Sequence, residues 1–567
     1  MASKRYFKKF SESYIETLSK LYHYSTSVYP DNQQSATVGG TQGYTFKEFK
    51  RTCDGVSKLM SCYGVGAGDR VAILSQNMPN WAIAFFATTA FGRVSVPILP
   101  DSSANEVTNI LTHSESKVLF VSKRMLSKVT PECMEKLPLV IDIETLISIK
   151  KDPEAFTCDG RVSEPNADDL AALIYTSGTT GNAKGVMLSH RNLAHNVICS
   201  YHCWKTTEKD SWLSILPMAH TYEMSIGFLY PFYVGACVNY LGKPMSTSVL
   251  MNALKEVRPT TMLSVPLIIE KVVKSNIIPT IKRSVLLSWM EKRMPRLLYR
   301  IVGKRLKKTF GGKIKFFGIG GAKLNIDVEN YLRKLHFPYA IGYGMTEAAP
   351  LVCTANPKET WPGTTGQAAY GVQVKLDNVD PETGEGELIA RGDNIMLGYY
   401  KDPDRTRSVF TEDGWYKTND LASIDSKGRY SIKGRLNNMI LGPSGENIYP
   451  EEIEKVINDL NLVTESLVLE RDGKLVALVQ LDENVLNYKI SNEDEIIQKL
   501  EATKKSILES VNKVVGKSSK ISSVEVMDEP FEKTATMKIR RFLYKKTNTP
   551  AADKAKQTEE DKKTSDK

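Results

Sequence analysis

The stretch YTSGTTGNAKGVMLSH, residues 175–190, combines five Ser and Thr side chains, three glycines and a single lysine. It follows an apolar run, residues 170–175, that is typical of a strand. Glycines let a backbone curl so that several N–H groups point at one anion, and hydroxyl groups add further donors. The stretch therefore predicts a phosphate-binding loop, with a nucleoside triphosphate as the first candidate ligand.

The alternative is a flexible Gly/Ser/Thr linker, which would not be expected between a strand and a helix. Here Ser189 can cap a helix in which Leu193, Val197 and Tyr201 recur at helical spacing. The common phosphate loop G-x-x-x-x-G-K-[ST] is excluded. Counted from Gly178, its second glycine position holds Ala183, and a glycine follows the lysine.

Composition predicts an ordinary globular protein. The chain has 567 residues, of which 41% are hydrophobic and 25% charged. At roughly 150 residues per domain, this length allows about four domains or fewer large ones. The eight cysteines show no paired metal-ligand spacing, which favours reduced thiols. The N-terminus is basic without an apolar core, and the most apolar stretch, residues 81–91, is too short to span a bilayer. We expect a cytoplasmic protein.

The net charge of +10 is concentrated between residues 282 and 313. Glu291 is the sole acidic residue there, against eleven basic ones: Lys282, Arg283, Lys292, Arg293, Arg296, Arg300, Lys304, Arg305, Lys307, Lys308 and Lys313. Pro295 can start an amphipathic helix whose basic face holds Arg296, Arg300, Lys304 and Lys307, and whose apolar face holds Leu298, Val302 and Leu306. Two interpretations remain open: a solvated helix packed on its own domain, or peripheral surface contact with an anionic membrane at its inner face. No nucleic-acid partner is expected.

Short apolar runs alternate with helical patterns from residue 71 to about 435, which predicts an α/β fold of parallel-rich sheets covered by helices. A smaller α+β unit follows, with a helix over 450–460, a hairpin turning at residues 472–473 and a helix near 493–515. We expect a large N-terminal domain at 1–436, a small mobile C-terminal domain at 437–546 and a disordered tail at 547–567.

Seven short motifs occur along the chain. They are LPMAH (216–220), GIGGAKL (318–324), YGMTE (343–347), GWYKTND (414–420), IKGRLNNMI (432–440), GPSGENIYPEEIE (442–454) and EKTATMKIRR (532–541). Each is weak alone, but in this order they closely resemble the adenylate-forming superfamily of acyl-CoA synthetases, luciferases and peptide-synthetase adenylation domains. LPMAHTYE and the basic insertion after residue 282 are most similar to the long-chain fatty acyl-CoA synthetases.

This resemblance implies a ligase with two half-reactions. A fatty acid carboxylate attacks ATP to give acyl-AMP and pyrophosphate, and the thiol of coenzyme A then displaces AMP. The resemblance implies phosphate binding by Thr176, Ser177, Gly178, Thr179, Thr180, Gly181 and Lys184. Glu347 would ligate Mg²⁺, and Thr346 would contact the α-phosphate.

The remaining roles are also implied by the resemblance. Asp420 would accept hydrogen bonds from the ribose, and Arg435 would reach the ribose or phosphate. Tyr343 would offer its ring to adenine. The further residues are the catalytic Lys538, which bridges carboxylate and α-phosphate in the first step, His220 near the acyl pocket, and Gly320 and Gly321, where the backbone can approach closely.

The two steps require rotation of the small domain about a hinge, expected at Asn437, and Gly445 and Glu446 would then face the coenzyme A tunnel. Asn437 departs from the Asp or Lys that is more common in the family, and Met537 from a glycine. Asn tolerates unusual backbone angles, as a hinge requires, whereas Met537 is expected to stiffen or reposition the loop that carries Lys538.

Two rival interpretations remain. The first is an acyl-AMP ligase that loads a carrier protein and not coenzyme A. The second is a non-catalytic relative that binds fatty acids or membranes. The second is disfavoured because the chain retains the full set of charged residues expected for adenylation, which a binding module does not need. These residues are Lys184, Glu347, Asp420, Arg435 and Lys538.

Overall fold

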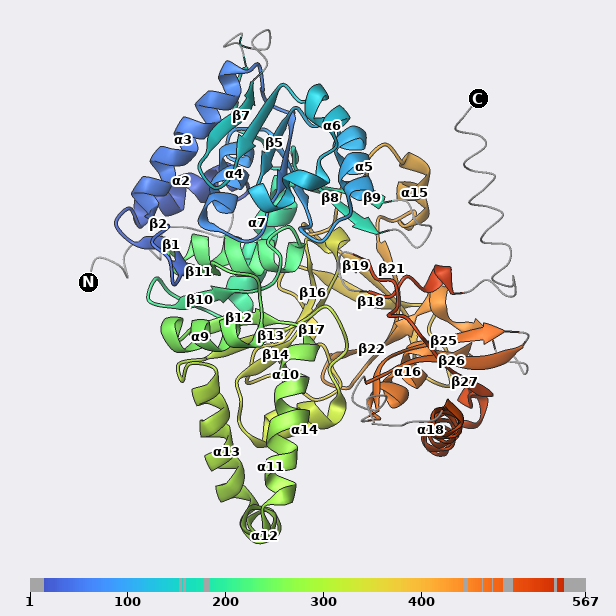
Figure 1. The fold of residues 1–567 in the computed structure, drawn as a ribbon. Helices are drawn as coiled ribbons and strands as arrows, with labels where there is room; N and C mark the ends of the chain where they lie inside the picture. The colour runs from blue at the N-terminus through green and yellow to red at the C-terminus, as the bar shows by residue number, and fades with distance from the viewer. Residues whose placement is uncertain are drawn as a thin grey trace. The chain divides into compact units, whose positions relative to one another are not determined.

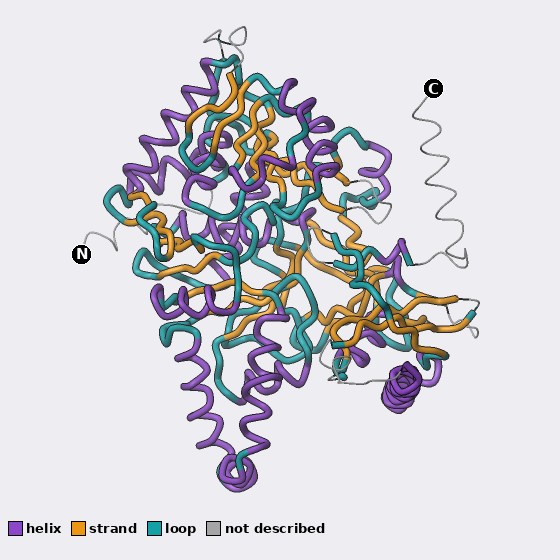
Figure 2. Tube along the Cα trace, viewed as in Figure 1, coloured by secondary structure: helices purple, strands orange, loops and turns teal. Residues whose placement is uncertain are grey.

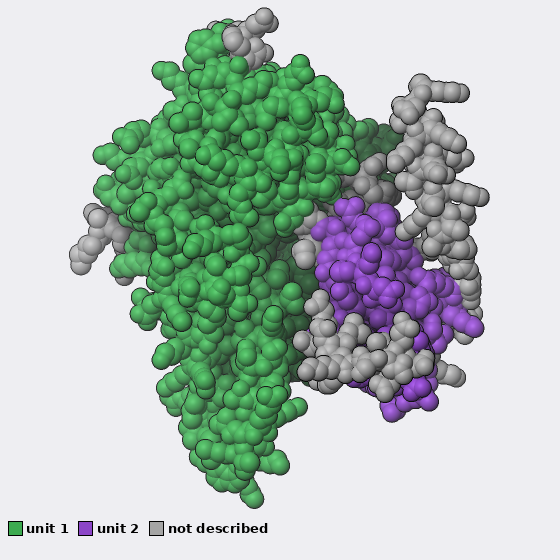
Figure 3. Space-filling model, in the orientation of Figure 1, with its two compact units in different colours: residues 1–178, 182–432 green, residues 179–181, 433–567 purple. Residues whose placement is uncertain are grey.

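The computed structural model describes residues 15–151, 156, 160–177, 183–441, 447–460, 462–471, 473–482, 493–534 and 538–544. The chain forms two compact units, shown in different colours in Figure 3. The larger contains the described residues up to 432 and the smaller those from 433 onward. This division falls within the strand that leads to the expected domain boundary after residue 436. The expected disordered tail lies outside the described residues.

The larger unit contains two parallel-rich sheets (Figure 1). The first has the strand order β20-β9-β8-β4-β3-β5-β6-β7. Its strands are β3 (Arg70–Leu74), β4 (Val94–Ile98), β5 (Val118–Val121), β6 (Leu139–Asp142), β7 (Ile147–Lys151), β8 (Leu170–Ser177), β9 (Ala183–Ser189) and β20 (Gly398–Tyr399). The inner strands pair in parallel, whereas β7, β9 and β20 are antiparallel to their neighbours.

The second sheet has the order β14-β13-β12-β10-β11-β1-β2, and all of its pairs are parallel except β1 with β2. Its strands are β1 (Gln33–Val38), β2 (Gly43–Thr45), β10 (Ser211–Ser214), β11 (Cys237–Leu241), β12 (Thr261–Ser264), β13 (Phe316–Ile319) and β14 (Tyr339–Ile341). The apolar runs that the sequence marked as strands lie in these two sheets, which confirms the predicted fold class.

Most helices of the larger unit cover these sheets, whereas a group of three projects away from them (Figure 2). The helices of this unit include α2 (Leu18–Val28), α3 (Phe46–Cys62), α4 (Pro79–Thr89), α5 (Ala104–Ser114), α6 (Pro131–Lys136), α7 (His190–Cys203), α8 (Tyr230–Tyr233), α9 (Thr247–Val257), α10 (Pro266–Val272), α11 (Ile278–Arg283), α12 (Val285–Arg293), α13 (Pro295–Thr309), α14 (Ile326–Lys334) and α15 (Pro403–Ser408). Every residue of α4 is buried. A helix that is apolar all round belongs in a core, which explains the apolar stretch at 81–91. Among the described residues, no helix is long and apolar enough to cross a bilayer.

An aromatic cluster joins α4 to the chain after β10. Trp81 stacks on Phe85 with ring centroids 5.5 Å apart, and Phe86 lies 5.5 Å from Phe228 and 4.4 Å from Phe232. All five side chains are buried. Because such rings exclude water over a large area, this cluster is a rigid base for the segment that begins at His220.

Smaller antiparallel sheets complete the larger unit, a feature that the sequence did not predict. One combines β15 (Tyr343–Gly344), β16 (Leu351–Thr354) and β17 (Gln367–Ala368). The other combines β18 (Gln373–Asp377), β19 (Gly386–Arg391), β21 (Tyr416–Ile424) and β22 (Tyr430–Arg435), the last of which runs into the smaller unit. These sheets carry the YGMTE and GWYKTND motifs.

The smaller unit is an α+β unit, as the sequence predicts. It contains β23 (Ile440–Leu441), β24 (Asn447–Ile448), α16 (Pro450–Asn458), β25 (Val463–Arg471), β26 (Lys474–Leu481), α18 (Glu493–Val514) and β27 (Ser523–Val526). Strands β25 and β26 form the predicted hairpin, and β27 pairs in parallel with β26. Ile453, Ile457 and Val511 from the two helices pack against this sheet in one apolar core.

Candidate active site

The glycine-rich stretch connects two antiparallel strands. Thr176 at the end of β8 pairs with Lys184 at the start of β9, so these two antiparallel strands form a hairpin. The sequence predicts a strand, a loop and a helix in this order. The structure adds strand β9 between the loop and the helix. Four predicted phosphate ligands lie outside the described residues: Gly178, Thr179, Thr180 and Gly181. Helix α7 then begins at His190, and Ser189 caps it by accepting from the Asn192 N–H, as predicted.

Gly185 lets β9 pass close to a neighbouring segment. A Cβ atom at this position would lie 2.9 Å from Leu173 Cδ1 and 3.3 Å from Tyr400 Cβ. Because both contacts are tighter than ordinary van der Waals distance, a larger residue would push β9 away from its partners. The glycine in the motif is therefore needed for packing at the root of the hairpin.

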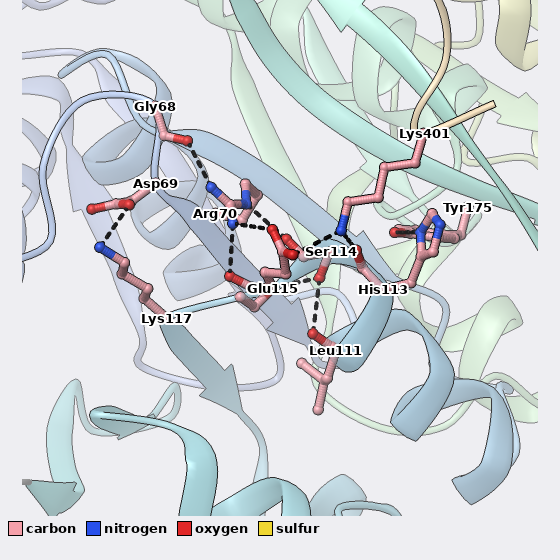
Figure 4. A network of polar contacts seen from close by, with 11 residues as sticks. Gly68, Asp69, Arg70, Leu111, His113, Ser114, Glu115, Lys117, Tyr175 and Lys401 are labelled. Atoms are coloured by element: carbon pink, nitrogen blue, oxygen red, sulfur yellow. Dashed lines mark hydrogen bonds and ion pairs between the residues drawn. The ribbon is translucent and has the colours of Figure 1, made fainter. Parts of the chain in front are cut away.

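A polar network supports the end of β8 from outside (Figure 4). The hydroxyl of Tyr175 lies 2.7 Å from His113 Nδ1, at the end of α5. Next to it, the Glu115 carboxylate pairs with Arg70 at 3.0 Å and with Lys401 at 2.8 Å. Lys401, followed by Arg70, lowers the pKa of Glu115. The network joins β3, α5, β8 and the segment after β20, so the start of the hairpin has a fixed base.

Helix α7 holds the YGMTE motif in place. Asn196 donates from Nδ2 to the Ala348 carbonyl at 3.1 Å and accepts from the Leu351 N–H at 2.9 Å. From the other side, Asn394 donates to the Leu351 carbonyl at 2.7 Å. Each of these buried amides satisfies backbone groups of the turn that follows Thr346. The turn carrying Thr346 is thus fixed relative to the helix that begins just after the hairpin.

Tyr399 brings Lys184 and Glu347 together. Its hydroxyl donates to Glu347 Oε1 at 3.0 Å, and the ammonium of Lys184 lies 5.0 Å from the centre of its ring. The backbone of Glu347 is held in turn by the Met396 N–H at 2.9 Å. Two predicted site residues from motifs more than 150 residues apart therefore meet on one aromatic side chain. Sequence reasoning missed Tyr399, which belongs to none of the quoted motifs.

Asp420 and Tyr343 are joined directly. The Tyr343 hydroxyl donates to Asp420 Oδ2 at 2.5 Å, and Asp420 is 4% exposed. Burial and the Asp420 charge raise the pKa of Tyr343 far above its usual range. The Asp420 N–H donates to Thr418 Oγ1 at 3.1 Å, which fixes the strand at this point. A ligand that binds Asp420 would therefore share the carboxylate with the Tyr343 hydroxyl, which already donates a hydrogen bond to it.

The glycines of GIGG make room for an aromatic ring. A Cβ on Gly318 would lie 3.0 Å from the Tyr222 hydroxyl, and one on Gly320 would lie 3.1 Å from Tyr222 Cζ. Gly321 has φ +85°, a conformation that favours glycine. His220 starts the same segment, and its Nδ1 accepts from the Tyr222 N–H at 3.2 Å. The group that lies close to the Gly320 backbone is therefore the Tyr222 ring.

An apolar cavity of about 50 Å³ lies beside these residues in the larger unit. Its lining includes Trp204, Trp212, Tyr222, Tyr230, Phe316, Gly318, Ala340, Gly342, Leu351 and Ala355. Gly318 belongs to the GIGG motif and Gly342 immediately precedes YGMTE. The cavity thus borders the backbone of two candidate nucleotide-binding motifs, although its polar lining is small.

In the smaller unit, Arg435 ends β22 and Asn437 lies in a short 3₁₀ turn, Leu436–Asn438. Both side chains are exposed. The next residue, Asn438, donates from Nδ2 to Glu451 Oε1 at 2.6 Å, so the chain is attached to α16 directly after the predicted hinge. The predicted coenzyme A residues Gly445 and Glu446 lie outside the described residues.

Lys538 lies in a segment of the smaller unit, next to an antiparallel bridge between Lys533 and Ile539. Its N–H donates to Thr534 Oγ1 at 3.2 Å, and its carbonyl accepts from the Thr534 N–H at 2.8 Å. Arg541 anchors the segment through an ion pair with buried Glu454 on α16. Lys538 itself is exposed, whereas Met537 lies outside the described residues. The backbone around Lys538 is thus held by two independent attachments.

Comparison with known families identifies this arrangement. The family model for AMP-binding enzymes matches residues 25–400, which is about two thirds of the chain. This chain is an AMP-binding enzyme. The resemblance to the adenylate-forming superfamily is therefore confirmed, and the matched range contains the hairpin, Glu347 and the cavity residues. Enzymes of this family use ATP, Mg²⁺ and coenzyme A, as the sequence predicts.

The AMP-binding enzyme is similar to several characterised proteins. It is 29% identical over 499 residues to long chain acyl-CoA synthetase 6, peroxisomal, of Arabidopsis thaliana, covering 79% of this chain and 70% of the relative. It is 26% identical over 606 residues to the chloroplastic long-chain-fatty-acid--[acyl-carrier-protein] ligase AEE15 of the same plant, covering 88% and 81%. The structure of O-succinylbenzoate coenzyme A synthetase (MenE) from Bacillus subtilis in complex with AMP superposes with a TM-score of 0.73 at 22% identity, covering 93% and 98%. That likeness establishes the fold.

The donor set of this AMP-binding enzyme fits a magnesium ion that arrives with the nucleotide. Glu347 Oε1 accepts from Tyr399, and its second oxygen has no hydrogen-bond partner among the described residues. Across those residues there is no group of three or more His, Cys, Asp or Glu side chains that could hold a metal ion. Mg²⁺ is usually bound by one or two carboxylates together with substrate phosphates, so a single Glu is sufficient.

Glu223 is a further feature of this AMP-binding enzyme that sequence reasoning did not single out. It lies one residue after Tyr222, is 1% exposed, and its Oε2 has no hydrogen-bond partner among the described residues. Gly227 makes space for it, since a Cβ there would lie 2.5 Å from Glu223 Cδ. Burial raises the pKa of Glu223 to about 8, against a smaller opposing effect of Ser214. The sequence signal is an acid inside the apolar run after LPMAH.

We expect Glu223→Gln to stabilise the enzyme at pH 8 and to leave its stability at pH 5 nearly unchanged. The folded protein keeps a proton that the unfolded chain releases as pH rises from about 4.5 to about 8. Stability is therefore lost across this window, by on the order of a few kcal/mol, and the neutral amide avoids that loss. Thermal unfolding at both pH values measures the effect, with exposed Glu412→Gln as the control. An equal shift at pH 5 and pH 8 would contradict the assignment.

Proposed function

We propose that the protein activates a long-chain fatty acid with ATP, giving acyl-AMP and pyrophosphate, and transfers the acyl group to coenzyme A, giving acyl-CoA and AMP. The observation that carries the proposal is the apolar cavity bordered by Gly318 and Gly342. An alkyl chain requires an apolar lining, and the carboxylate must end beside the nucleotide. The position of the cavity beside two nucleotide motifs meets both needs.

The chain length of the acid depends on movement of the cavity lining. A pocket that holds a drug-sized ligand has a volume of about 300–1,000 Å³, well above the cavity seen here. Side chains such as Ile226 and Leu263 must therefore move to admit a long acyl group. The long-chain synthetase from Arabidopsis supports this class of substrate.

The charged residues of the larger unit serve the first half-reaction in this proposal. A carboxylate attacks a polyanion slowly, because like charges repel and the two reactants must be held in line. Lys184 and the hydroxyls beside it neutralise the β- and γ-phosphates. Glu347 would hold Mg²⁺, and the ion would supply positive charge to the phosphate oxygens. Tyr399 fixes Glu347 and packs under Lys184, so it is a positioning residue.

The nucleoside and the small unit complete the proposed mechanism. Asp420 accepts the ribose hydroxyls, and Thr346 contacts the α-phosphate. Arg435 reaches the ribose or phosphate, and Lys538 bridges the carboxylate and the α-phosphate during adenylation alone. Rotation about Asn437 then exchanges Lys538 for the coenzyme A residues, since one pocket must serve two different reactions.

The alternative acceptor is a carrier protein. The similarity to the plant acyl-carrier-protein ligase keeps this candidate open, because both activities need the same adenylation residues. A direct comparison of acceptors distinguishes them. Consumption of coenzyme A with a supplied fatty acid supports the proposal, whereas acyl-AMP that reacts with a carrier protein alone supports the alternative.

The decisive experiment is a panel of fatty acids of increasing length, assayed for ATP–pyrophosphate exchange and for coenzyme A consumption. We expect long acids to be preferred and both activities to require Mg²⁺. Ala355→Phe, which fills the cavity, should reduce the rate with long acids more than with short ones. If exchange occurs with short acids alone, the proposed substrate class is wrong. If exchange fails with every acid, the ligase proposal itself fails.

A further inference from the structure

A helical projection extends from the larger unit. Helices α11 and α13 run away from the sheets, and α12 joins them at the far end (Figures 1 and 2). Not one residue of α12 is buried. A helix on the surface of a globular protein normally buries one apolar face against its own core. The end of the projection lacks that core.

The far end of the projection exposes large apolar side chains. The exposed fractions are 87% for Val285, 65% for Leu286, 52% for Trp289, 42% for Met294, 43% for Leu297 and 51% for Ile301. Trp289 lies one turn after Val285 and Leu286, and Ile301 lies one turn after Leu297, so each helix presents its apolar residues together. We call these six residues the apolar tip. Large apolar side chains exposed in this number on neighbouring helices are typical of a contact site on a protein surface.

The opposite face of α13 packs on the larger unit, so the apolar tip is not exposed because the helix fails to pack. Leu298 and Leu306 are buried, as expected for the predicted apolar face. A Cβ on Gly303 would lie 2.1 Å from the Leu335 carbonyl oxygen, so α13 contacts the body of the unit closely. The predicted packing on its own domain is therefore real. A second apolar face, which the sequence analysis did not identify, points outward.

Positive charge accompanies the apolar tip. Ten basic side chains between residues 282 and 313 are exposed: Lys282, Arg283, Lys292, Arg293, Arg296, Arg300, Lys304, Arg305, Lys308 and Lys313. Among the residues that the structure describes, none of these ten forms an ion pair. Glu291, the one acid in the segment, accepts instead from the Tyr299 hydroxyl at 3.0 Å. The positive charge is thus not neutralised within the segment.

We propose that the apolar tip and the basic residues of α12 and α13 bind an anionic lipid bilayer, with the tip entering the interfacial layer. Apolar side chains with Trp enter the headgroup region, and Lys and Arg pair with anionic headgroups. Charge complementarity favours such a surface, because an anionic bilayer presents many negative groups around an apolar interior. The exposed apolar tip extends the expected surface contact to shallow insertion. This inference does not depend on the proposed reaction.

The test is sedimentation of the full-length protein with vesicles of phosphatidylcholine alone or with phosphatidylserine added. We expect binding to the anionic vesicles, weakened by salt because the Debye length falls to about 3 Å at 1 M. Arg296→Glu, Arg300→Glu and Lys304→Glu together should weaken binding at least tenfold. Three charge reversals on α3, at Lys47, Arg51 and Lys58, are the matched control and should have little effect. Those residues are also exposed, and α3 lies far from α12 in Figure 1.

Insertion of the tip is measured separately. We expect a blue shift of tryptophan fluorescence on addition of anionic vesicles, and its loss in Trp289→Phe, one of six tryptophans. Val285→Ser with Leu286→Ser should weaken binding at physiological salt while unfolding at the wild-type temperature. The proposal is overturned if the wild type ignores anionic vesicles at low salt, or if the α3 control weakens binding equally. It is also overturned if the tip proves to be covered by a second copy of the chain in solution.

Discussion

Lys538→Ala is expected to slow acyl-AMP formation by about a hundred- to thousandfold. Loss of a positioned charge at a charged transition state typically costs about 2.7–4 kcal/mol, which corresponds to this factor. The Lys538 side chain is exposed, while its backbone is tied to Thr534 and, through Arg541, to Glu454. The substitution should therefore remove the charge without unfolding the smaller unit. ATP–pyrophosphate exchange with a saturating fatty acid measures the effect.

The second half-reaction supplies the internal control for this prediction. Acyl-CoA formation from supplied acyl-AMP should continue near the wild-type rate, because Lys538 acts in adenylation alone. Lys520→Ala removes another exposed lysine of the same unit and should leave both half-reactions intact. Equal loss in both half-reactions would show that Lys538 supports the fold or a shared binding step, and the proposed role would then be wrong.

Asn437→Pro is expected to have the opposite pattern, with adenylation largely kept and thioester formation reduced on the order of a hundredfold. Proline fixes φ and also restricts the residue before it, and where it conflicts with the backbone it costs about 3 kcal/mol or more. That cost corresponds to about two powers of ten in rate. Asn438 is already bound to Glu451, so rotation would have to occur just before this attachment.

Asn437→Ala is the matched control because it removes the exposed side chain but leaves φ unrestricted. We expect it to keep both half-reactions. The measurement is the rate of acyl-CoA formation from supplied acyl-AMP, compared with exchange in the same preparation. A proline variant that forms acyl-CoA at the wild-type rate would place the hinge at another residue.

The sequence determined those features that depend on neighbouring residues. Ser189 caps α7, Pro295 begins α13 and the turn before Lys474 joins β25 to β26, each as the local pattern predicts. Cap hydrogen bonds and the fixed φ of proline act within one turn, so their consequences can be read along the chain. The ordered motifs also determined the family, because the chemistry of phosphate and carboxylate binding requires the same residue types.

Contacts between distant segments were decided by the tertiary structure. Tyr399 meets Lys184 and Glu347, and Tyr343 meets Asp420, because separate sheets bring these residues together. No local pattern records which hydroxyl lies within hydrogen-bond distance of which carboxylate. The antiparallel partner β9 was missed for the same reason, since its pairing depends on a hairpin and not on apolar spacing.

Burial was the other property that required the folded chain. The local sequence does not fix the exposure of Glu223, an acid within an apolar run, or of Trp289. In the structure the acid is 1% exposed and the indole 52% exposed. Exposure depends on which distant segments cover a side chain. The aromatic cluster belongs to the buried core of the larger unit, whereas no segment of the described chain buries a residue of α12. The sequence by itself therefore determined the family, the caps and the chemical groups of the site. The tertiary structure decided which of those groups meet and which side chains lose contact with water, because burial changes the free energy of charge and of apolar surface.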